Sequence, residues 1–271
     1  MAEKSLKIRG VEWRYVTGGR GEQTILLFHG AVGGAETMRA LAAAFGDEYR
    51  TVVPTIADVS TLEEVCDAAS AILDREHVGR AVVFGGSFGG MLAQALFRRR
   101  REQVQDLVLL STTAPNPAAG ARTARSARLT RLLPFALTRA MMRLEVSKQL
   151  EAPVPDEYAA RVAEFRRGLE DYLEHTLTKR TLLSRVALSV DFNRDGRHAP
   201  ETQDGWPGRV LIIESDDEHS NEERRRLREA YPRALVCTFP GAGQLTPLLR
   251  TEELVGVVKA FIKEDYSTPA E

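Results

Sequence analysis

One short stretch, Gly85-Gly86-Ser87-Phe88-Gly89-Gly90, constrains the fold of this chain more than any other. An apolar run, residues 81–84, comes before it, and residues 91–97, which have helical character, come after it. A G-x-S-x-G turn between a strand and a helix is typical of a nucleophile elbow. The glycines allow strand and helix to approach closely, so we expect the Ser87 hydroxyl to project above the carboxyl end of a sheet. The alternative is a glycine-rich turn between strand and helix in which the serine has no functional role.

The rest of the chain alternates between apolar runs of strand length and segments of helical periodicity. Strands are expected near residues 24–28, 51–53, 81–84, 107–110, 209–213 and 234–237. Helices are expected over about 36–46, after Ser60, from 91, from 221 and over 251–263. Ser60 and Glu63 have the spacing of a capping box, and residues 6–17 suggest an edge hairpin closed by Gly18-Gly19. This order predicts a doubly wound, mostly parallel sheet with right-handed crossovers.

One long segment, residues 113–205, interrupts this alternation. It has no buried-strand runs, and its helical periodicity is broken by several prolines. A helical block between strands that continue one sheet predicts an inserted cap rather than a separate domain. We therefore expect an α/β core formed by residues 1–112 and 206–265, a cap at 113–205, and a flexible tail at 266–271.

Composition excludes several classes of protein. The chain has 271 residues, 43% of them hydrophobic and 28% charged, which suits one large domain with an insert. A net charge of -1 argues against a general nucleic-acid binder. Cys66 and Cys237 form neither a disulfide framework nor a CxxC pair, and no pattern indicates a metal or an organic cofactor. The sequence shows no signal peptide and no membrane-spanning run, so we expect a cytoplasmic protein, not an integral membrane protein.

The order of these motifs resembles the α/β-hydrolase superfamily along essentially the whole chain. The matching features are His29-Gly30 after an early strand, the elbow, the helical cap, an acidic loop and a terminal loop. In that superfamily the oxyanion hole uses the amide after the nucleophile and one from the earlier strand–helix loop. The resemblance therefore implies Phe88 and Ala31 as the donors. It also implies structural roles for Gly85, Gly89, His29 and Gly30.

The resemblance places the catalytic acid after the strand at 209–213, within residues 214–218. Spacing from the strand favours Asp217, and Asp216 is the runner-up. The loop at 111–113, the other usual location, carries no carboxylate. A solvated polar turn remains the alternative interpretation.

The catalytic base is where this chain departs from the superfamily. The superfamily has a histidine after its last strand, often in Gly-x-Gly-His, whereas this chain reads Gly241-Ala242-Gly243-Gln244. Gln244 thus stands in the histidine's place. Glutamine has no group that titrates near neutral pH, so it cannot accept the serine proton. Loss of a triad base usually leaves only the oxyanion hole and substrate binding, a drop of about 10⁴- to 10⁶-fold.

One of the remaining histidines is a candidate to replace the missing catalytic base. His77 precedes the elbow strand, and His175 and His198 lie in the expected cap. His219 is two residues beyond Asp217 and is the candidate nearest the acidic loop. An exposed loop histidine is the simpler interpretation of His219.

Within the superfamily the chain is most similar to a maspardin-like branch. The similar features are the segment Leu132-Leu133-Pro134-Phe135 followed by basic residues, and the terminal Gly-x-Gly turn without histidine. Maspardin-like proteins are regarded mainly as non-classical members of the fold that act through binding partners. This resemblance implies a missing base, which a generic esterase assignment does not.

The first part of the expected cap is strongly basic. Arginines recur every third residue along one side of a predicted helix, with leucines beside them: Arg122, Arg125, Arg128 and Arg131. A solvated basic face is the plain interpretation. The alternatives are recruitment of an anionic ligand, or docking on an acidic partner or a membrane surface.

These observations leave three functional hypotheses, and catalytic activity itself stays open. The first is a serine-hydrolase relative that acts on a small ester, lactone or thioester under the cap, with an altered base. The second is a non-hydrolytic binding or regulatory protein that kept the pocket. The third is a non-hydrolytic lyase or cyclase on the same fold, in which the oxyanion hole polarises a carbonyl. Substrate identity and oligomeric state are not encoded in any motif.

Overall fold

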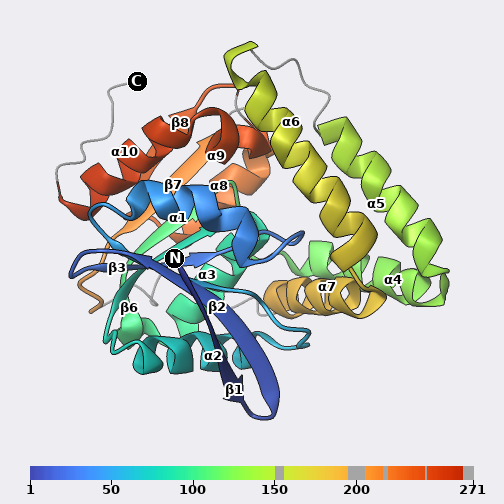
Figure 1. The fold of residues 1–271 in the computed structure, drawn as a ribbon, viewed down its shortest axis with the longest axis horizontal. Helices are drawn as coiled ribbons and strands as arrows, with labels where there is room; N and C mark the ends of the chain where they lie inside the picture. The colour runs from blue at the N-terminus through green and yellow to red at the C-terminus, as the bar shows by residue number, and fades with distance from the viewer. Residues whose placement is uncertain (150–155, 195–204, 216–218, 242, 265–271) are drawn as a thin grey trace.

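The fold is a single eight-stranded sheet with helices packed on both faces (Figure 1). The computed structural model describes residues 1–149, 156–194, 205–215, 219–241 and 243–264. Strands follow the order β1-β2-β4-β3-β5-β6-β7-β8 across the sheet. β1 and β2 form an antiparallel hairpin at one edge, β2 pairs antiparallel with β4, and the other strands are parallel. The predicted mostly parallel, doubly wound sheet is therefore confirmed.

Each predicted strand is present, although several are longer than their apolar cores. The strands are β1 (Ala2–Ile8), β2 (Val11–Gly19), β3 (Thr24–Phe28), β4 (Arg50–Pro54), β5 (Ala81–Gly86), β6 (Val104–Leu110), β7 (Val210–Ser215) and β8 (Leu235–Phe239). β3 is buried along its whole length, and β7 likewise. Parallel strands covered on both faces bury both sets of side chains, which explains why these segments read as unbroken apolar runs.

The two faces of the sheet carry separate hydrophobic clusters. α2 (Leu62–Arg75), α3 (Phe88–Arg99) and α8 (Asn221–Ala230) contribute to one cluster, together with alternate strand residues such as Leu26 and Val83. α1 (Arg39–Phe45) and α10 (Thr251–Ile262) contribute to the other, with Ile25 and Val82. Side chains alternate between faces along a strand, so the sheet separates the two clusters. Cys66 lies in the first cluster and Cys237 in the second, both as buried free thiols.

The start of α2 differs by one residue from the sequence prediction. The capping box is Thr61 with Glu64, not Ser60 with Glu63. The Thr61 hydroxyl accepts the Glu64 amide at 3.3 Å, and the Glu64 carboxylate accepts the Thr61 amide at 3.1 Å. That carboxylate also accepts the Ser60 amide at 3.2 Å. Both pairs have the required spacing, and the choice depends on which residue is extended at the helix entry, here Thr61.

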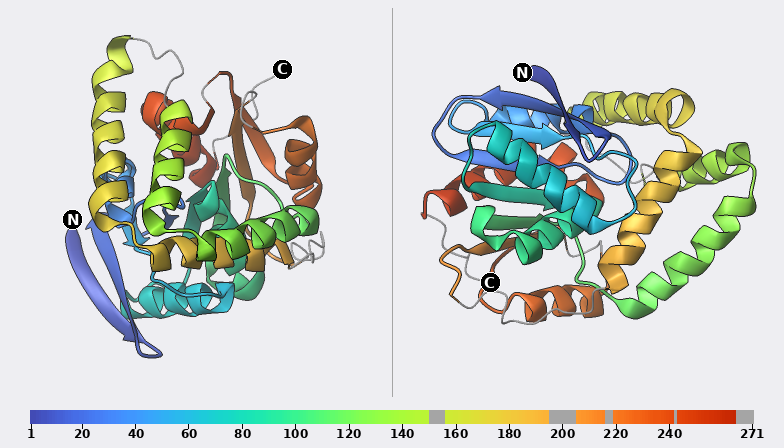
Figure 2. Two further views of the ribbon diagram at one scale, coloured as in Figure 1. Left: turned by 90° about the vertical axis from the view of Figure 1, so that its right-hand side faces the viewer. Right: turned by 90° about the horizontal axis from the view of Figure 1, so that it is seen from below.

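Between β6 and β7, the described residues form four longer helices: α4 (Pro117–Leu132), α5 (Phe135–Gln149), α6 (Asp156–Asp171) and α7 (Lys179–Arg194), with a π-helical turn at Tyr172–Thr176. They form the side of the molecule that the left panel of Figure 2 faces. The limits of the cap, residues 113–205, stay a prediction. Among the described residues, no helix is long and apolar enough to cross a membrane.

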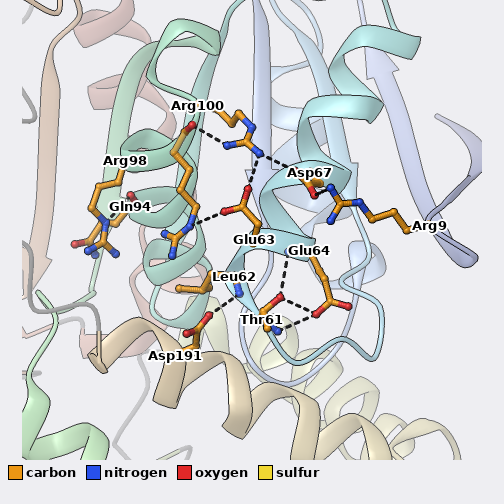
Figure 3. A network of polar contacts seen from close by, with 11 residues as sticks. Arg9, Thr61, Leu62, Glu63, Glu64, Asp67, Gln94, Arg98, Arg100 and Asp191 are labelled. Carbon is orange, nitrogen blue, oxygen red and sulfur yellow. Dashed lines mark hydrogen bonds and ion pairs between the residues drawn. The ribbon is translucent and has the colours of Figure 1, made fainter.

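α7 fixes this helical layer to the core through polar contacts with the segment between β4 and α2. The Asp191 carboxylate accepts the Leu62 amide at 2.8 Å, at the amino end of α2 (Figure 3). The Ser184 hydroxyl donates to the Val59 carbonyl at 2.6 Å. The buried Arg185 guanidinium donates to the carbonyls of Ile56, at 2.5 Å, and Ala57, at 3.1 Å. α7 is thus attached to the core at several points.

Candidate active site

Ser87 occupies a strained backbone position between the last residue of β5 and the first residue of α3. Its φ is 50° and its ψ is -117°, a region that non-glycine residues rarely adopt. The Ser87 amide donates to the Leu110 carbonyl of β6 at 2.9 Å, and the Thr112 hydroxyl donates to the Ser87 carbonyl at 2.8 Å. The backbone is therefore fastened by the neighbouring strand, while Ser87 itself is exposed.

The two outer glycines of the motif are required because backbone atoms fill the space where a Cβ would lie. A Cβ on Gly85 would overlap the carbonyl group of Gly89. A Cβ on Gly89 would overlap the Phe28 carbonyl oxygen and lie 2.9 Å from that of His29. The start of α3 therefore packs directly against the carboxyl end of β3. This contact brings the elbow beside the loop that contains Ala31, so the two segments with the predicted oxyanion amides meet.

His29 is a buried histidine directly after β3, at the start of this loop. Its Nδ1 lies 2.7 Å from the Gly30 carbonyl oxygen, and its Nε2 lies 3.0 Å from the Ile56 amide nitrogen. The amide can only donate, so Nε2 accepts and Nδ1 carries the proton of a neutral ring. Burial, and secondarily the charge of Arg185, lowers the pKa of His29 to about 4. Both ring nitrogens are engaged by backbone groups, which fits the structural role implied by the sequence.

β7 extends two residues beyond its predicted end, and this moves part of the predicted acidic loop onto the strand. Glu214 and Ser215 are buried strand residues, and Glu214 forms an ion pair with Arg228 of α8. Asp217, the predicted acid, and Asp216, its runner-up, lie outside the described residues.

Sequence reasoning missed Ser215, which connects the last two strands to the terminal turn. Its hydroxyl donates to the Phe239 carbonyl of β8 at 2.8 Å and accepts the Gly243 amide at 2.9 Å. The Thr246 hydroxyl donates to the Gly243 carbonyl at 2.8 Å. Gln244 follows Gly243 within a short 3₁₀ turn, Gly243–Leu245, and its side chain lies outside the description. A serine at the end of a buried strand, just before two aspartates, was the available signal.

The described histidines other than His29 lie in different surroundings. His77 is exposed just before β5, so the length of that strand, about 20 Å for six residues, separates it from Ser87. His175 is exposed on the π-helical turn, with Nε2 3.9 Å from an Asp171 carboxylate oxygen. His219 is half-buried next to Ser220, the N-cap of α8. His198 lies outside the described residues.

Comparison with known proteins decides the family. The sequence model described as the alpha/beta hydrolase family matches residues 25–257, most of the chain. The chain belongs to the alpha/beta hydrolase family. This match includes the elbow, the helical segment and the terminal turn. No curated protein matches the sequence at a significant level.

Solved structures with the same architecture include several hydrolases. A thermophilic esterase from Thermogutta terrifontis, described as malate bound, superposes with a TM-score of 0.76 at 17% identity, covering 98% of this chain and 100% of the other. An enol-lactonase from Burkholderia xenovorans LB400 superposes with a TM-score of 0.74 at 17% identity, covering 96% of this chain and 100% of the other. The epoxide hydrolase VrEH1 from Vigna radiata superposes with a TM-score of 0.76 at 16% identity, covering 97% of this chain and 98% of the other. At these identities the likeness establishes the alpha/beta hydrolase fold alone.

The described part of this alpha/beta hydrolase contains no cluster of three or more His, Cys, Asp or Glu side chains able to hold a metal ion. The elements that the structure does bring to one sheet edge are the elbow, the His29 loop, the end of β7 and the turn after β8. Carboxyl ends of parallel strands meet at a common edge, which is where ligands bind in open α/β sheets.

Proposed function

We propose that this alpha/beta hydrolase is a serine-hydrolase relative that acts on a small ester, lactone or thioester, with Ser87 as the nucleophile. The observation that carries the proposal is the strained, exposed position of Ser87 directly before α3. A structure maintains such a conformation only where surrounding contacts impose it, and such residues cluster at functional sites.

The proposed chemistry uses Ser87 and the site residues predicted from the sequence. The Ser87 oxygen attacks the carbonyl carbon of the substrate, and negative charge develops on the carbonyl oxygen. The amides of Phe88 and Ala31 would stabilise that charge, because backbone donors fixed before the reaction need no reorganisation. Asp217 is proposed as the acid and Gln244 as the residue in the base position. The carbon–oxygen or carbon–sulfur bond to the leaving group then breaks, and the alcohol or thiol departs with the proton that the serine hydroxyl lost, which leaves an acyl-enzyme. Water hydrolyses this ester, releases the acid product and restores the Ser87 hydroxyl.

The glutamine at 244 supports a second candidate, a non-hydrolytic binding or regulatory protein related to the maspardin-like branch. Glutamine can orient a ligand by hydrogen bonding but cannot remove the serine proton near neutral pH. A lyase or cyclase that uses only the oxyanion hole is the third candidate. These alternatives differ from the first in one measurable property, the nucleophilicity of Ser87.

Two measurements test the proposal. A fluorophosphonate probe should label the wild type at Ser87 and should not label Ser87→Ala. Gln244→His should supply an imidazole between Ser87 and the acid and raise turnover of p-nitrophenyl acetate by about 10²-fold. The gain should vanish in Gln244→His combined with Ser87→Ala, because triad members act as a unit.

Each contrary outcome has a distinct meaning. A folded Gln244→His variant with no gain, in a protein that the probe does not label, would favour the binding protein. A wild type with high turnover and a bell-shaped pH profile would assign the base to another group such as His219. Circular dichroism and thermal unfolding of each variant separate these outcomes from misfolding.

A further inference from the structure

Large exposed apolar side chains concentrate on the helices between β6 and β7. Of the seven that the described residues expose, all but Met1 lie there: Leu129 and Leu132 on α4, Leu137, Met141 and Leu144 on α5, and Phe165 on α6. Leu132 is 85% exposed, and Leu129, Met141 and Leu144 are each near 60%. Single exposed leucines need no explanation, but six large apolar side chains exposed on three consecutive helices indicate an interaction site.

The apolar stripe of α5 faces away from the rest of the molecule. Leu137, Met141 and Leu144 follow the i, i+4, i+7 spacing of one helix face. The side of α5 that faces inward carries the buried Thr138 and the half-buried Met142. A surface helix normally shows the reverse pattern, with polar residues outward, so α5 exposes the face that would usually be covered.

α4 exposes its large side chains because small residues line its inner face. α4 and α7 pack closely, and a Cβ on Gly120 would lie 2.7 Å from the Cβ of Asn193. Ala124 and Ala127 continue this half-buried face. The outer face therefore holds Leu129 and Leu132 among the exposed arginines Arg122, Arg125, Arg128 and Arg131. We call these four arginines, with the five leucine and methionine side chains of α4 and α5, the cap face.

The positive charge of the cap face indicates which kind of partner binds there. Among the described residues, Arg125, Arg128 and Arg131 form no ion pair, whereas arginines elsewhere, such as Arg50, Arg100 and Arg228, do. A symmetric contact with a second copy would bring these arginines against each other, and like charges oppose association. The occupant must therefore be both anionic and able to accept protruding apolar side chains.

We propose that the cap face docks on an anionic phospholipid bilayer. Basic residues beside exposed leucines are the composition of helices that lie in the membrane interface. α4 and α5 form an outer edge of the molecule, as Figure 1 shows, so they can meet a flat surface without steric obstruction from the sheet. The fluid acyl chains accept the side chains, and the guanidinium groups contact lipid phosphates. This proposal does not depend on the proposed hydrolase function.

Vesicle flotation with the full chain tests the proposal. The wild type should float with vesicles of phosphatidylcholine mixed with phosphatidylglycerol, and should not float with phosphatidylcholine alone. Arg125→Gln/Arg128→Gln/Arg131→Gln should weaken binding about 100-fold, since each basic residue at an anionic surface contributes about fivefold. Binding of the wild type should fall as salt shortens the Debye length.

Two further variants separate charge from apolar insertion. Leu137→Ser/Met141→Ser/Leu144→Ser should also abolish flotation while leaving thermal unfolding unchanged, because these side chains are exposed. Lys7→Gln/Arg225→Gln/Arg226→Gln removes the same charge from β1 and α8, where Lys7 and Arg225 are exposed and Arg226 is half-buried, and should bind like the wild type.

Several results would overturn the proposal. Equal flotation of the wild type and the Arg125 triple variant would remove the arginines from any role in docking. Binding to polyglutamate without binding to vesicles would assign the face to an acidic protein partner. Self-association in sedimentation velocity that disappears in the Leu137 triple variant, without vesicle binding, would assign it to a second copy.

Discussion

Gly89 illustrates at the residue scale how little freedom the elbow has. A Cβ there would meet the carbonyl oxygens of Phe28 and His29, which are backbone atoms of a buried strand end and cannot move aside. We therefore expect Gly89→Ala to lower the free energy of unfolding by about 3 kcal/mol. Urea unfolding followed by circular dichroism measures this loss.

Gly256 provides the matched control for this substitution. It lies exposed within α10, and a Cβ built there meets no neighbouring atom of the described chain within 4 Å. Gly256→Ala should raise the free energy of unfolding by about 0.4 to 1 kcal/mol, because alanine reduces the entropy of the unfolded chain. Equal effects at the two positions would contradict the close packing inferred for the elbow.

At the scale of elements, Ser215 connects β7, β8 and the turn that carries Gln244. Ser215→Ala would leave the Phe239 carbonyl and the Gly243 amide without this partner. We expect a loss of about 1 to 3 kcal/mol in unfolding free energy. If the turn also shifts, the rate gained by Gln244→His should shrink when Ser215→Ala is added. The measurements are urea unfolding and ester turnover of the single and double variants.

Ser111 is the corresponding control on the neighbouring strand. It follows β6 as Ser215 ends β7, and it is also buried, but its hydroxyl has no hydrogen-bond partner within the described chain. Ser111→Ala should therefore change the unfolding free energy by less than about 0.5 kcal/mol. A large loss at Ser111, or none at Ser215, would show that the hydrogen bonds of Ser215 do not hold the turn.

For the whole molecule, His29 makes stability depend on pH. Its pKa is about 4 in the folded protein and about 6.5 in the unfolded chain, so the unfolded chain binds the proton first as pH falls. The contribution of His29 to the free energy of unfolding is fully present above pH 6.5 and is lost toward pH 4. This loss lowers the free energy of unfolding by about 2 kcal/mol between pH 7.5 and 5. Carboxylates with lowered pKa, such as Glu76, lose their contribution only at lower pH.

His29→Gln isolates this contribution, because glutamine can donate and accept hydrogen bonds but does not titrate in this range. The variant will be less stable overall, so the quantity to compare is the change in unfolding free energy between pH 7.5 and 5. We expect a smaller change in His29→Gln than in the wild type. The same change in both proteins would mean that other groups cause the acid sensitivity.

The sequence alone determined the architecture, because burial on both faces of a parallel sheet forces continuous apolar runs such as Thr24–Phe28. It also predicted the elbow, since the glycine spacing at 85 and 89 around Ser87 is a local pattern typical of a turn between a strand and a helix. Tertiary structure decided what local pattern leaves undetermined. Hydrogen bonds to β8 and the terminal turn gave Ser215 its position, and the extension of β7 moved Glu214 out of the predicted acidic loop. The packing of α4 on α7 determines which side of α4 faces outward. These outcomes depend on contacts between residues far apart in the chain, which no local spacing encodes.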